Sequence, residues 1–478
     1  MNAAIVRVFG LVVILFALLV VWTSRWSVFE ATALNDNALN RRPLVDQLVI
    51  KRGRILADDG TVLAESVPAG GGTWSRRYPT AALFAQAVGY SIAVQGRAAG
   101  LELSRGSQLR GVQSTLTSIF GQLNPHPVGD DVYTTLDPRA QQVAEQALAG
   151  RAGSVVALDP RTGAVKVMFS NPSYDDNHPD HCPPASCSEF NRATQAAYAP
   201  GSTFKIVTAT AAIDSGAYTP DSVIDGNSPI TVSGVPLAND GGQSWGPQTL
   251  TTAMTYSINT IFAQVAEHLG RATMTTYMKR FGFYAKPPLD YPSSELRASD
   301  VLSFNGKALA PGSPDEDIGR IGIGQGGLAV APLQMAMVAA AVANGGKLMA
   351  PRLADRVVDQ TGRTIETFAP SVYSQVMKPS TAAEVTQMME KVVEEGTGTA
   401  VQLGSISVAG KTGTASIGPA GADETQPSFV AFAPAQAPRI AIAVMIEKSQ
   451  GGFGGTVAAP VAKAVLQTLL SEGGGGVG

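Results

Sequence analysis

The stretch PGSTFK at residues 200–205, which continues as IVTATAAIDSG to Gly216, is the segment from which the fold can be argued. Proline and glycine mark the start of a helix, so Ser202 falls at its N-terminus and Lys205 lies three residues later on the same face. A serine hydroxyl needs a base beside it to act as a nucleophile, and a buried lysine with a lowered pKa can serve. Because Ser-x-x-Lys is common by chance, this motif alone does not assign a function.

A second motif, Ser257-Ile258-Asn259, follows in the middle of the chain. Ser257 is a candidate to pass a proton between Lys205 and a leaving amine, and Asn259 is a candidate to bind a substrate amide. A tripeptide carries little weight by itself, so the value of this motif depends on what accompanies it.

A third motif, Lys411-Thr412-Gly413-Thr414, lies near the C-terminus in VAGKTGTAS. A threonine-rich segment after a valine suits a β-strand, in which Gly413 lets a ligand approach the backbone closely. We assign Lys411 to a substrate carboxylate and residues 412–414 to substrate binding. The backbone N–H groups of Ser202 and Thr414 are the candidate oxyanion donors.

A similar stretch, Gly396-Thr397-Gly398-Thr399-Ala400, repeats the Thr-Gly-Thr-Ala of the third motif upstream. Glu395 precedes it, and it has no lysine. Because the chemistry needs the cation, we do not place this repeat in the site.

Turn and cap signals predict several local elements. Asp58-Asp59-Gly60, residues 161–163 and residues 434–438 each separate two apolar runs and predict hairpins. Asp137 and Pro138 predict the start of a helix that Gly150 stops, and residues 457–471 predict a closing helix. Predicted strands near both ends of the range 130–472 favour one sheet whose strands come from both ends of that range.

The order Ser-x-x-Lys, Ser-x-Asn, Lys-Thr-Gly is the signature of the penicillin-binding protein and serine β-lactamase superfamily. The chain resembles the class B, monofunctional penicillin-binding proteins, and most closely the compact actinobacterial PbpA-like members. One departure is Asp176, where the family often has proline. Further stretches that resemble the family are residues 52–55 with Gly60, 100–102, 171–175, 323–326, 331–336 and 429–434.

The resemblance implies an α+β fold. A five-stranded antiparallel sheet would lie between helices, with an all-helical lobe that carries Ser257 and a β-rich pedestal before it. The implied divisions are a cytoplasmic end at 1–7, a transmembrane signal anchor at 8–26, a dimerisation-like pedestal at 34–128, a transpeptidase domain at 130–472 and a flexible tail at 473–478.

The N-terminal apolar run approaches the roughly 20 residues that span a bilayer. We interpret it as an uncleaved anchor, with a cleaved signal peptide as the alternative, for which Ala31 and Ala33 would form a late cleavage site. No second run of this length follows, so the rest of the chain is expected on one side of the membrane, outside the cytoplasm.

Cys182 and Cys187 are the only cysteines in the chain. A pair five residues apart in an extracytoplasmic loop favours a disulfide. His178 and His181 lie beside them, so a zinc site and two free thiols remain alternatives.

Other enzyme classes lack their residues in this sequence. The four histidines, His126, His178, His181 and His268, lie in no triad motif, and neither Gly-x-Ser-x-Gly nor His-Glu-x-x-His occurs. Glu295 does not form the Glu-x-x-x-Asn of a β-lactamase. The net charge of −3, without a basic patch, gives no indication of nucleic-acid binding.

The resemblance implies a peptidoglycan D,D-transpeptidase that cross-links stem peptides through a serine acyl-enzyme and is acylated by β-lactams. It implies no metal or cofactor, a role in division or in elongation and cell shape, and a SEDS-type glycosyltransferase as partner. A D,D-carboxypeptidase and a β-lactam sensor or division scaffold remain the alternatives.

Overall fold

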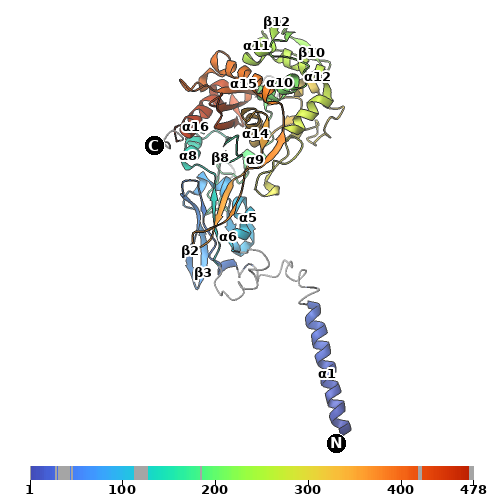
Figure 1. Ribbon diagram of the computed structural model, residues 1–478, viewed down its shortest axis with the longest axis vertical. Helices are drawn as coiled ribbons and strands as arrows, with labels where there is room; N and C mark the ends of the chain where they lie inside the picture. The colour runs from blue at the N-terminus through green and yellow to red at the C-terminus, as the bar shows by residue number, and fades with distance from the viewer. Residues whose placement is uncertain are drawn as a thin grey trace.

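The computed structural model describes residues 2–26, 30, 44, 47–111, 128–183, 186–417 and 423–472. The tail predicted at 473–478 lies outside these residues. Within them, the chain forms an N-terminal helix, a smaller β-rich part and a larger α+β part, which follow one another along the long axis (Figure 1).

The larger part is built on an antiparallel sheet in the order β19-β20-β21-β7-β8, with the short β22 (Ser449–Gln450) beside β20. The five-stranded antiparallel sheet expected from the resemblance is therefore confirmed, as are the hairpin turns at 161–163 and 434–438. The strands are β7 (Gly153–Leu158), β8 (Val165–Asn171), β19 (Ala409–Ser416), β20 (Glu424–Ala433) and β21 (Ile440–Ile446).

Helices cover both faces of this sheet because its strands are apolar on both sides. Val155 and Ala157 pack toward α8 (Pro138–Leu148) and α16 (Ala459–Glu472), whereas Val156 and Leu158 join the core with α14 (Pro332–Ala343). The α8 cap is as predicted, since the Asp137 side chain accepts a hydrogen bond from the N–H of Ala140.

A helical lobe stands beside the sheet and carries Ser257 between two of its helices. Two short two-stranded sheets, β9–β12 and β10–β11, also belong to this region, so the lobe is not all-helical as expected. Its helices are α10 (Lys205–Asp214), α11 (Leu250–Thr255), α12 (Asn259–Arg280) and α15 (Pro379–Glu394), and its strands are β9 (Val223–Asp225), β10 (Ile230–Val232), β11 (Val235–Leu237) and β12 (Pro247–Thr249).

The smaller part contains a second sheet, in the order β17-β16-β6-β1-β2-β3, which we call the N-terminal sheet. The hairpin predicted at Asp58–Gly60 joins β1 to β2. Three strands of this sheet come from the range 130–472, and in Figure 1 the orange strands lie beside the blue ones. The strands are β1 (Ile55–Leu56), β2 (Val62–Gly70), β3 (Thr73–Arg77), β6 (Asp131–Thr134), β16 (Ala354–Val358) and β17 (Thr364–Thr367).

A buried ion-pair cluster links two of the family-like stretches in this part. Glu102 accepts from Arg52 at 2.6 Å and from Arg76 at 2.5 Å, and its side chain is fully buried. Burial alone would raise the pKa of Glu102, but the two guanidiniums outweigh it and hold the pKa below its ordinary value. A buried carboxylate therefore persists here because both of its oxygens are paired.

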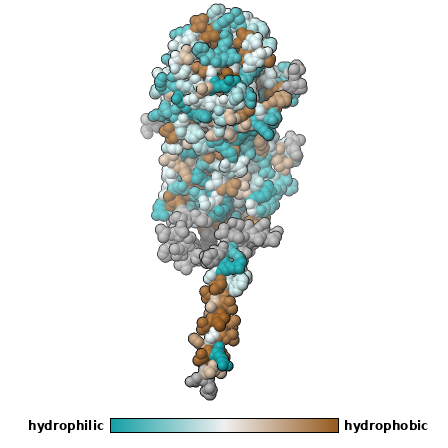
Figure 2. Space-filling view, turned by 90° about the vertical axis from the view of Figure 1, so that its right-hand side faces the viewer, coloured by the Kyte–Doolittle hydropathy of each residue, from teal (hydrophilic) through white to brown (hydrophobic). Residues whose placement is uncertain are grey.

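The N-terminal helix α1 (Asn2–Ser24) differs from the rest in polarity. Within residues 3–24, an 18-residue window has a mean hydropathy of 3.0 and no buried side chains, and Figure 2 shows the helix as an apolar rod below a mainly polar body. By length and composition it fits a single-pass membrane anchor, and no other helix in the described ranges does.

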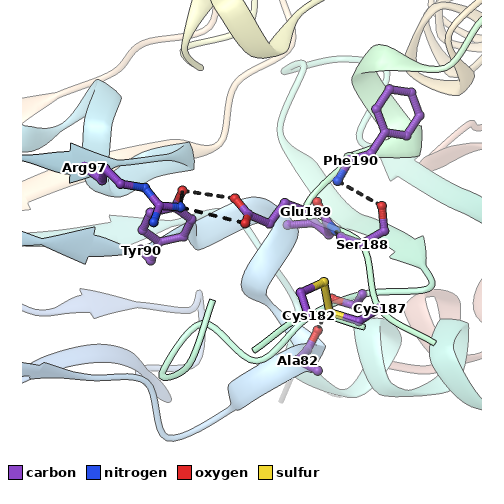
Figure 3. Close-up of a disulfide and its surroundings, with 10 residues drawn as sticks. Ala82, Tyr90, Arg97, Cys182, Cys187, Ser188, Glu189 and Phe190 are labelled. Atoms are coloured by element: carbon purple, nitrogen blue, oxygen red, sulfur yellow. Dashed lines mark hydrogen bonds and ion pairs between the residues drawn. A yellow bond between two sulfur atoms is a disulfide. The ribbon is translucent and has the colours of Figure 1, made fainter. Parts of the chain in front are cut away.

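The predicted disulfide is present between Cys182 and Cys187. Both sulfurs are used by the bond, which excludes the zinc and free-thiol alternatives for this state. The loop around it contacts the N-terminal part: Tyr90 donates to Glu189 at 3.0 Å, and Arg97 lies 3.8 Å from the same carboxylate (Figure 3). The disulfide loop therefore belongs to the contact between the two parts of the molecule.

Candidate active site

The nucleophile motif forms one turn of 3₁₀-helix, Gly201–Phe204, which leads directly into α10. The predicted helix start is confirmed, although the first turn is tighter than an α-helix. Gly201 has a φ of +54°, and its N–H donates to the carbonyl of Gly324, which belongs to the family-like stretch 323–326. Glycine is needed because a Cβ at Gly324 would lie 1.9 Å from the carbonyl oxygen of Gly201.

Lys205 joins the first motif to the second. Its ammonium nitrogen, Nζ, donates to the Ser257 carbonyl at 2.7 Å, to Ser257 Oγ at 3.2 Å and to Asn259 Oδ1 at 2.7 Å. The side chain is completely buried, and burial, aided by the charge of Lys411, lowers its pKa well below the ordinary value. A lysine in this setting can lose its proton and act as a base.

Asn259 has a different environment from the one expected. Its carbonyl oxygen accepts from Lys205, and its amide nitrogen donates to the carbonyl of Ala238 at 3.3 Å. In this structure the side chain therefore orients the lysine and ties down the loop at 238–240.

Lys411 lies on β19 with no exposed surface, and its Nζ donates to the carbonyl of Thr412 at 3.1 Å. Burial lowers its pKa to about 7, while the charge of Asp240 acts in the opposite sense. Its ammonium therefore lies behind the wall of the cleft, whereas we expected it to face a substrate carboxylate directly.

Gly413 is close-packed on the protein side. A Cβ at this position would lie 2.3 Å from Ser428 Oγ and 2.6 Å from the carbonyl oxygen of Pro200. The sequence interpretation assigned this glycine to ligand approach, but its missing side chain first lets β19 pack against the nucleophile turn.

These segments surround a cleft of about 390 Å³ that contains Ser202 and Ser257. The candidate oxyanion donors, Ser202 and Thr414, both line it. A larger cavity of about 500 Å³ lies far from the motifs, beside the N-terminal sheet. The cleft is lined by Ser202, Asp240, Ser257, Thr397, Thr399, Ala400, Thr412, Gly413, Thr414, Phe453, Gly454, Gly455 and Thr456.

The repeat at 396–400 contributes to this cleft, and our exclusion of it was wrong. Thr397 and Thr412 share a hydrogen bond between their hydroxyls at 2.6 Å, and Thr399 and Ala400 line the same wall. Lack of a lysine does not prevent a segment from forming a wall. The duplicated Thr-Gly-Thr-Ala was the available signal.

Sequence reasoning also missed Asp240 and residues 453–456. The N–H of Gly454 donates to Thr414 Oγ1 at 3.1 Å, so this glycine-rich turn closes the cleft beside the third motif. Neither segment has a spacing that points to the site.

Comparison with known proteins assigns the family. Residues 153–467 match penicillin-binding protein transpeptidase domains, and residues 52–123 match the dimerisation domain of penicillin-binding protein A. The chain belongs to the penicillin-binding protein transpeptidase family.

Relatives within this family cover nearly the whole chain. It is 33% identical to peptidoglycan D,D-transpeptidase PbpA of Mycolicibacterium smegmatis, over 99% of this chain and all of that protein. The PbpA of Mycobacterium tuberculosis H37Rv is 32% identical, over 98% and 99%.

Solved structures of penicillin-binding proteins have folds similar to that of this chain. The ceftriaxone acyl-enzyme of M. tuberculosis penicillin-binding protein A aligns with a TM-score of 0.80 and 30% identity, over 89% of this chain and all of that one. A D,D-transpeptidase domain from Eggerthella lenta aligns with a TM-score of 0.75 and 33% identity, over 89% and 99%.

Asp176 is the position at which the sequence departs from the pattern that the resemblance led us to expect. Its side chain is 2% exposed, and neither carboxyl oxygen has a hydrogen-bond partner by geometry within the described residues. Burial, followed by the charge of Asp175, raises the pKa of Asp176 to about 9. The burial of Asp176 thus favours its neutral, protonated form.

Proposed function

We propose that this chain is a peptidoglycan D,D-transpeptidase that acts through an acyl-enzyme on Ser202. The observation that carries the proposal is the buried Lys205, whose Nζ is held by Ser257 and Asn259 beside the cleft that contains Ser202. An acyl-transfer enzyme needs such a nucleophile and base together.

In the acylation step, Ser202 Oγ attacks the amide carbonyl between the two D-alanines of a stem peptide. Neutral Lys205 takes the hydroxyl proton, and Ser257 passes a proton to the nitrogen of the departing D-alanine. The backbone N–H groups of Ser202 and Thr414 stabilise the oxyanion. Lys411 contributes positive charge from behind Thr412, toward the terminal carboxylate of the donor.

An amine from a second stem peptide then attacks the acyl-enzyme, which forms the cross-link and releases Ser202. A β-lactam resembles the donor and leaves a stable acyl group on the same serine. None of these steps requires a metal or an organic cofactor.

Helix α1 supports the topology that we propose. The segment 8–26 anchors the chain in the cell membrane, with 1–7 in the cytoplasm and the domains at 34–128 and 130–472 outside. A SEDS-type glycosyltransferase would meet the anchor and the pedestal, during division or elongation.

The nucleophile is tested with the full-length chain in detergent, by intact mass with and without benzylpenicillin. We expect one penicilloyl adduct that persists for hours on the wild type and on the control Ser405→Ala, which changes an exposed serine. Ser202→Ala should show no adduct. A correctly folded wild type without an adduct would exclude Ser202 as the nucleophile, and rapid loss of the adduct would favour a β-lactamase.

A further inference from the structure

Asp240 has a distinctive position in the cleft. Among the described residues that line the cleft, it alone has a charged side chain. The residue is exposed, and no hydrogen bond or ion pair joins its carboxylate to another described residue. The cleft therefore contains a carboxylate that is free to bind a ligand.

The neighbouring residue, Asn239, holds Asp240 in place. Asn239 is buried; its Oδ1 accepts from the N–H of Thr260 at 2.9 Å, and its Nδ2 donates to the carbonyls of Gly226 and Gln243. Asn259 binds the preceding carbonyl, that of Ala238. The loop is thus fixed to the start of α12, next to Ser257, and the carboxylate does not depend on a mobile tether.

The charge of Asp240 affects the two buried lysines of the site. It acts to raise the pKa of both Lys205 and Lys411, although burial outweighs it at each lysine. Both ammonium groups donate to oxygens of other residues, so neither neutralises the carboxylate by contact. The other lining side chains are neutral serine, threonine, glycine, alanine and phenylalanine, so Asp240 supplies the only charge among the described residues of the lining, and this charge favours a cation.

We infer that Asp240 positions the acceptor amine, and so selects a primary amine over water in the second half of the reaction. This inference rests on the proposed transpeptidase function, which requires two substrates. The donor presents an acyl group and a carboxylate, whereas the acceptor presents a group that is ammonium at neutral pH. A fixed carboxylate beside Ser257 is complementary to the second and not to the first.

The acceptor arrives as R–NH₃⁺ against the carboxylate and releases one proton to water at the cleft mouth. The neutral nitrogen attacks the ester carbonyl, the C–N bond forms and the C–Oγ bond to Ser202 breaks. The second proton from nitrogen passes through Ser257 to Oγ, so that the serine hydroxyl is regenerated.

The test uses the full-length chain in detergent with an N-acyl-D-alanyl thioester as donor and a peptide with a free side-chain amine as acceptor. Mass spectrometry gives the ratio of aminolysis to hydrolysis product. The variants are Asp240→Asn and the matched control Asp221→Asn, which changes an exposed aspartate outside the cleft. Benzylpenicillin acylation of each variant is the reference reaction.

For Asp240→Asn we expect the ratio to fall about fivefold, the scale of one partly exposed charge pair, and to fall further than acylation does. Asp221→Asn should keep the wild-type ratio. A ratio of aminolysis to hydrolysis within twofold of wild type would overturn the inference. Acylation that falls as far as this ratio would also overturn it, because Asp240 would then act through the lysines. If the wild type acylates but gives only hydrolysis, the transpeptidase function itself fails.

Discussion

At the scale of single residues, the site depends on two lysines whose side chains are fully buried. Lys205 acts as a base only when it is neutral, and burial together with the charge of Lys411 lowers its pKa. Asp240 is the one acidic group that opposes this effect at both lysines. The protonation of Lys205 is therefore set by its neighbours as well as by its burial.

Lys411→Ala should move the pH profile of acylation. Removing the cation lets the pKa of Lys205 rise, so the acid limb of the rate against pH shifts to higher pH, and the rate at pH 6–7 falls. Lys411→Arg keeps the charge and should keep the midpoint, even if its rate is lower. Stopped-flow acylation by benzylpenicillin between pH 5 and 9 measures both. A lower rate with an unmoved midpoint in Lys411→Ala would show that Lys411 acts only in binding.

At the scale of elements, the disulfide loop packs against the N-terminal part. Asp180, two residues before Cys182, pairs with Arg97 at 2.5 Å, and the side chain of Gln86 donates to the carbonyl of Ser188, the residue after Cys187, at 2.7 Å. These contacts form only in the folded conformation of this segment. The Cys182–Cys187 bond restricts the conformations of the same segment in the unfolded chain, which stabilises the folded state.

Replacing both cysteines by serine should lower the free energy of unfolding by about 2 kcal/mol, the entropy expected for so short a closed loop. The measurement is the thermal unfolding midpoint without reductant, which should drop by a few degrees. Wild type with reductant is the control and should drop equally. An unchanged midpoint in the variant would mean that the loop is held by its hydrogen bonds alone.

Local elements were predictable where a local signal exists. The turns at 58–60, 161–163 and 434–438 and the Asp137 cap follow from residue preferences over a few positions, and the structure has each of them. The order of the motifs also predicted correctly that Lys205 and Ser257 lie in contact.

Long-range pairing was not predictable in the same way. Nothing in residues 354–367 indicates that they extend the N-terminal sheet, because β-pairing depends on partners elsewhere in the chain. For the same reason, Asp240 and residues 453–456 reach the cleft through the fold and not through any motif.

At the scale of the whole molecule, Asp176 lies where the two parts meet. The charge of Glu102, in the N-terminal part, is one of the causes that raise the pKa of Asp176. Its folded pKa of about 9 exceeds the ordinary value of 3.8, so the folded protein binds this proton more tightly than the unfolded chain does. The contribution to stability is complete below about pH 4 and is lost as the pH rises toward 9.

Asp176→Asn should remove this dependence. Between pH 6 and 8, wild type should lose up to about 1 kcal/mol per pH unit relative to the variant, so the unfolding midpoints of the two proteins diverge as the pH rises. Chemical denaturation at both pH values measures the difference, and Asp315→Asn, at an exposed position, is the control. Equal changes in the wild type and in Asp176→Asn would contradict a neutral buried Asp176.

The N-terminal sheet also constrains how the protein is made. Strand β6 lies between β1 and β16, and β16 ends at Val358, so the sheet lacks two of its strands until that residue has been synthesised. Until then β6 presents an unpaired edge, which is a site for incorrect pairing between chains. The N-terminal sheet is thus among the first parts of the protein to be synthesised and among the last to finish folding.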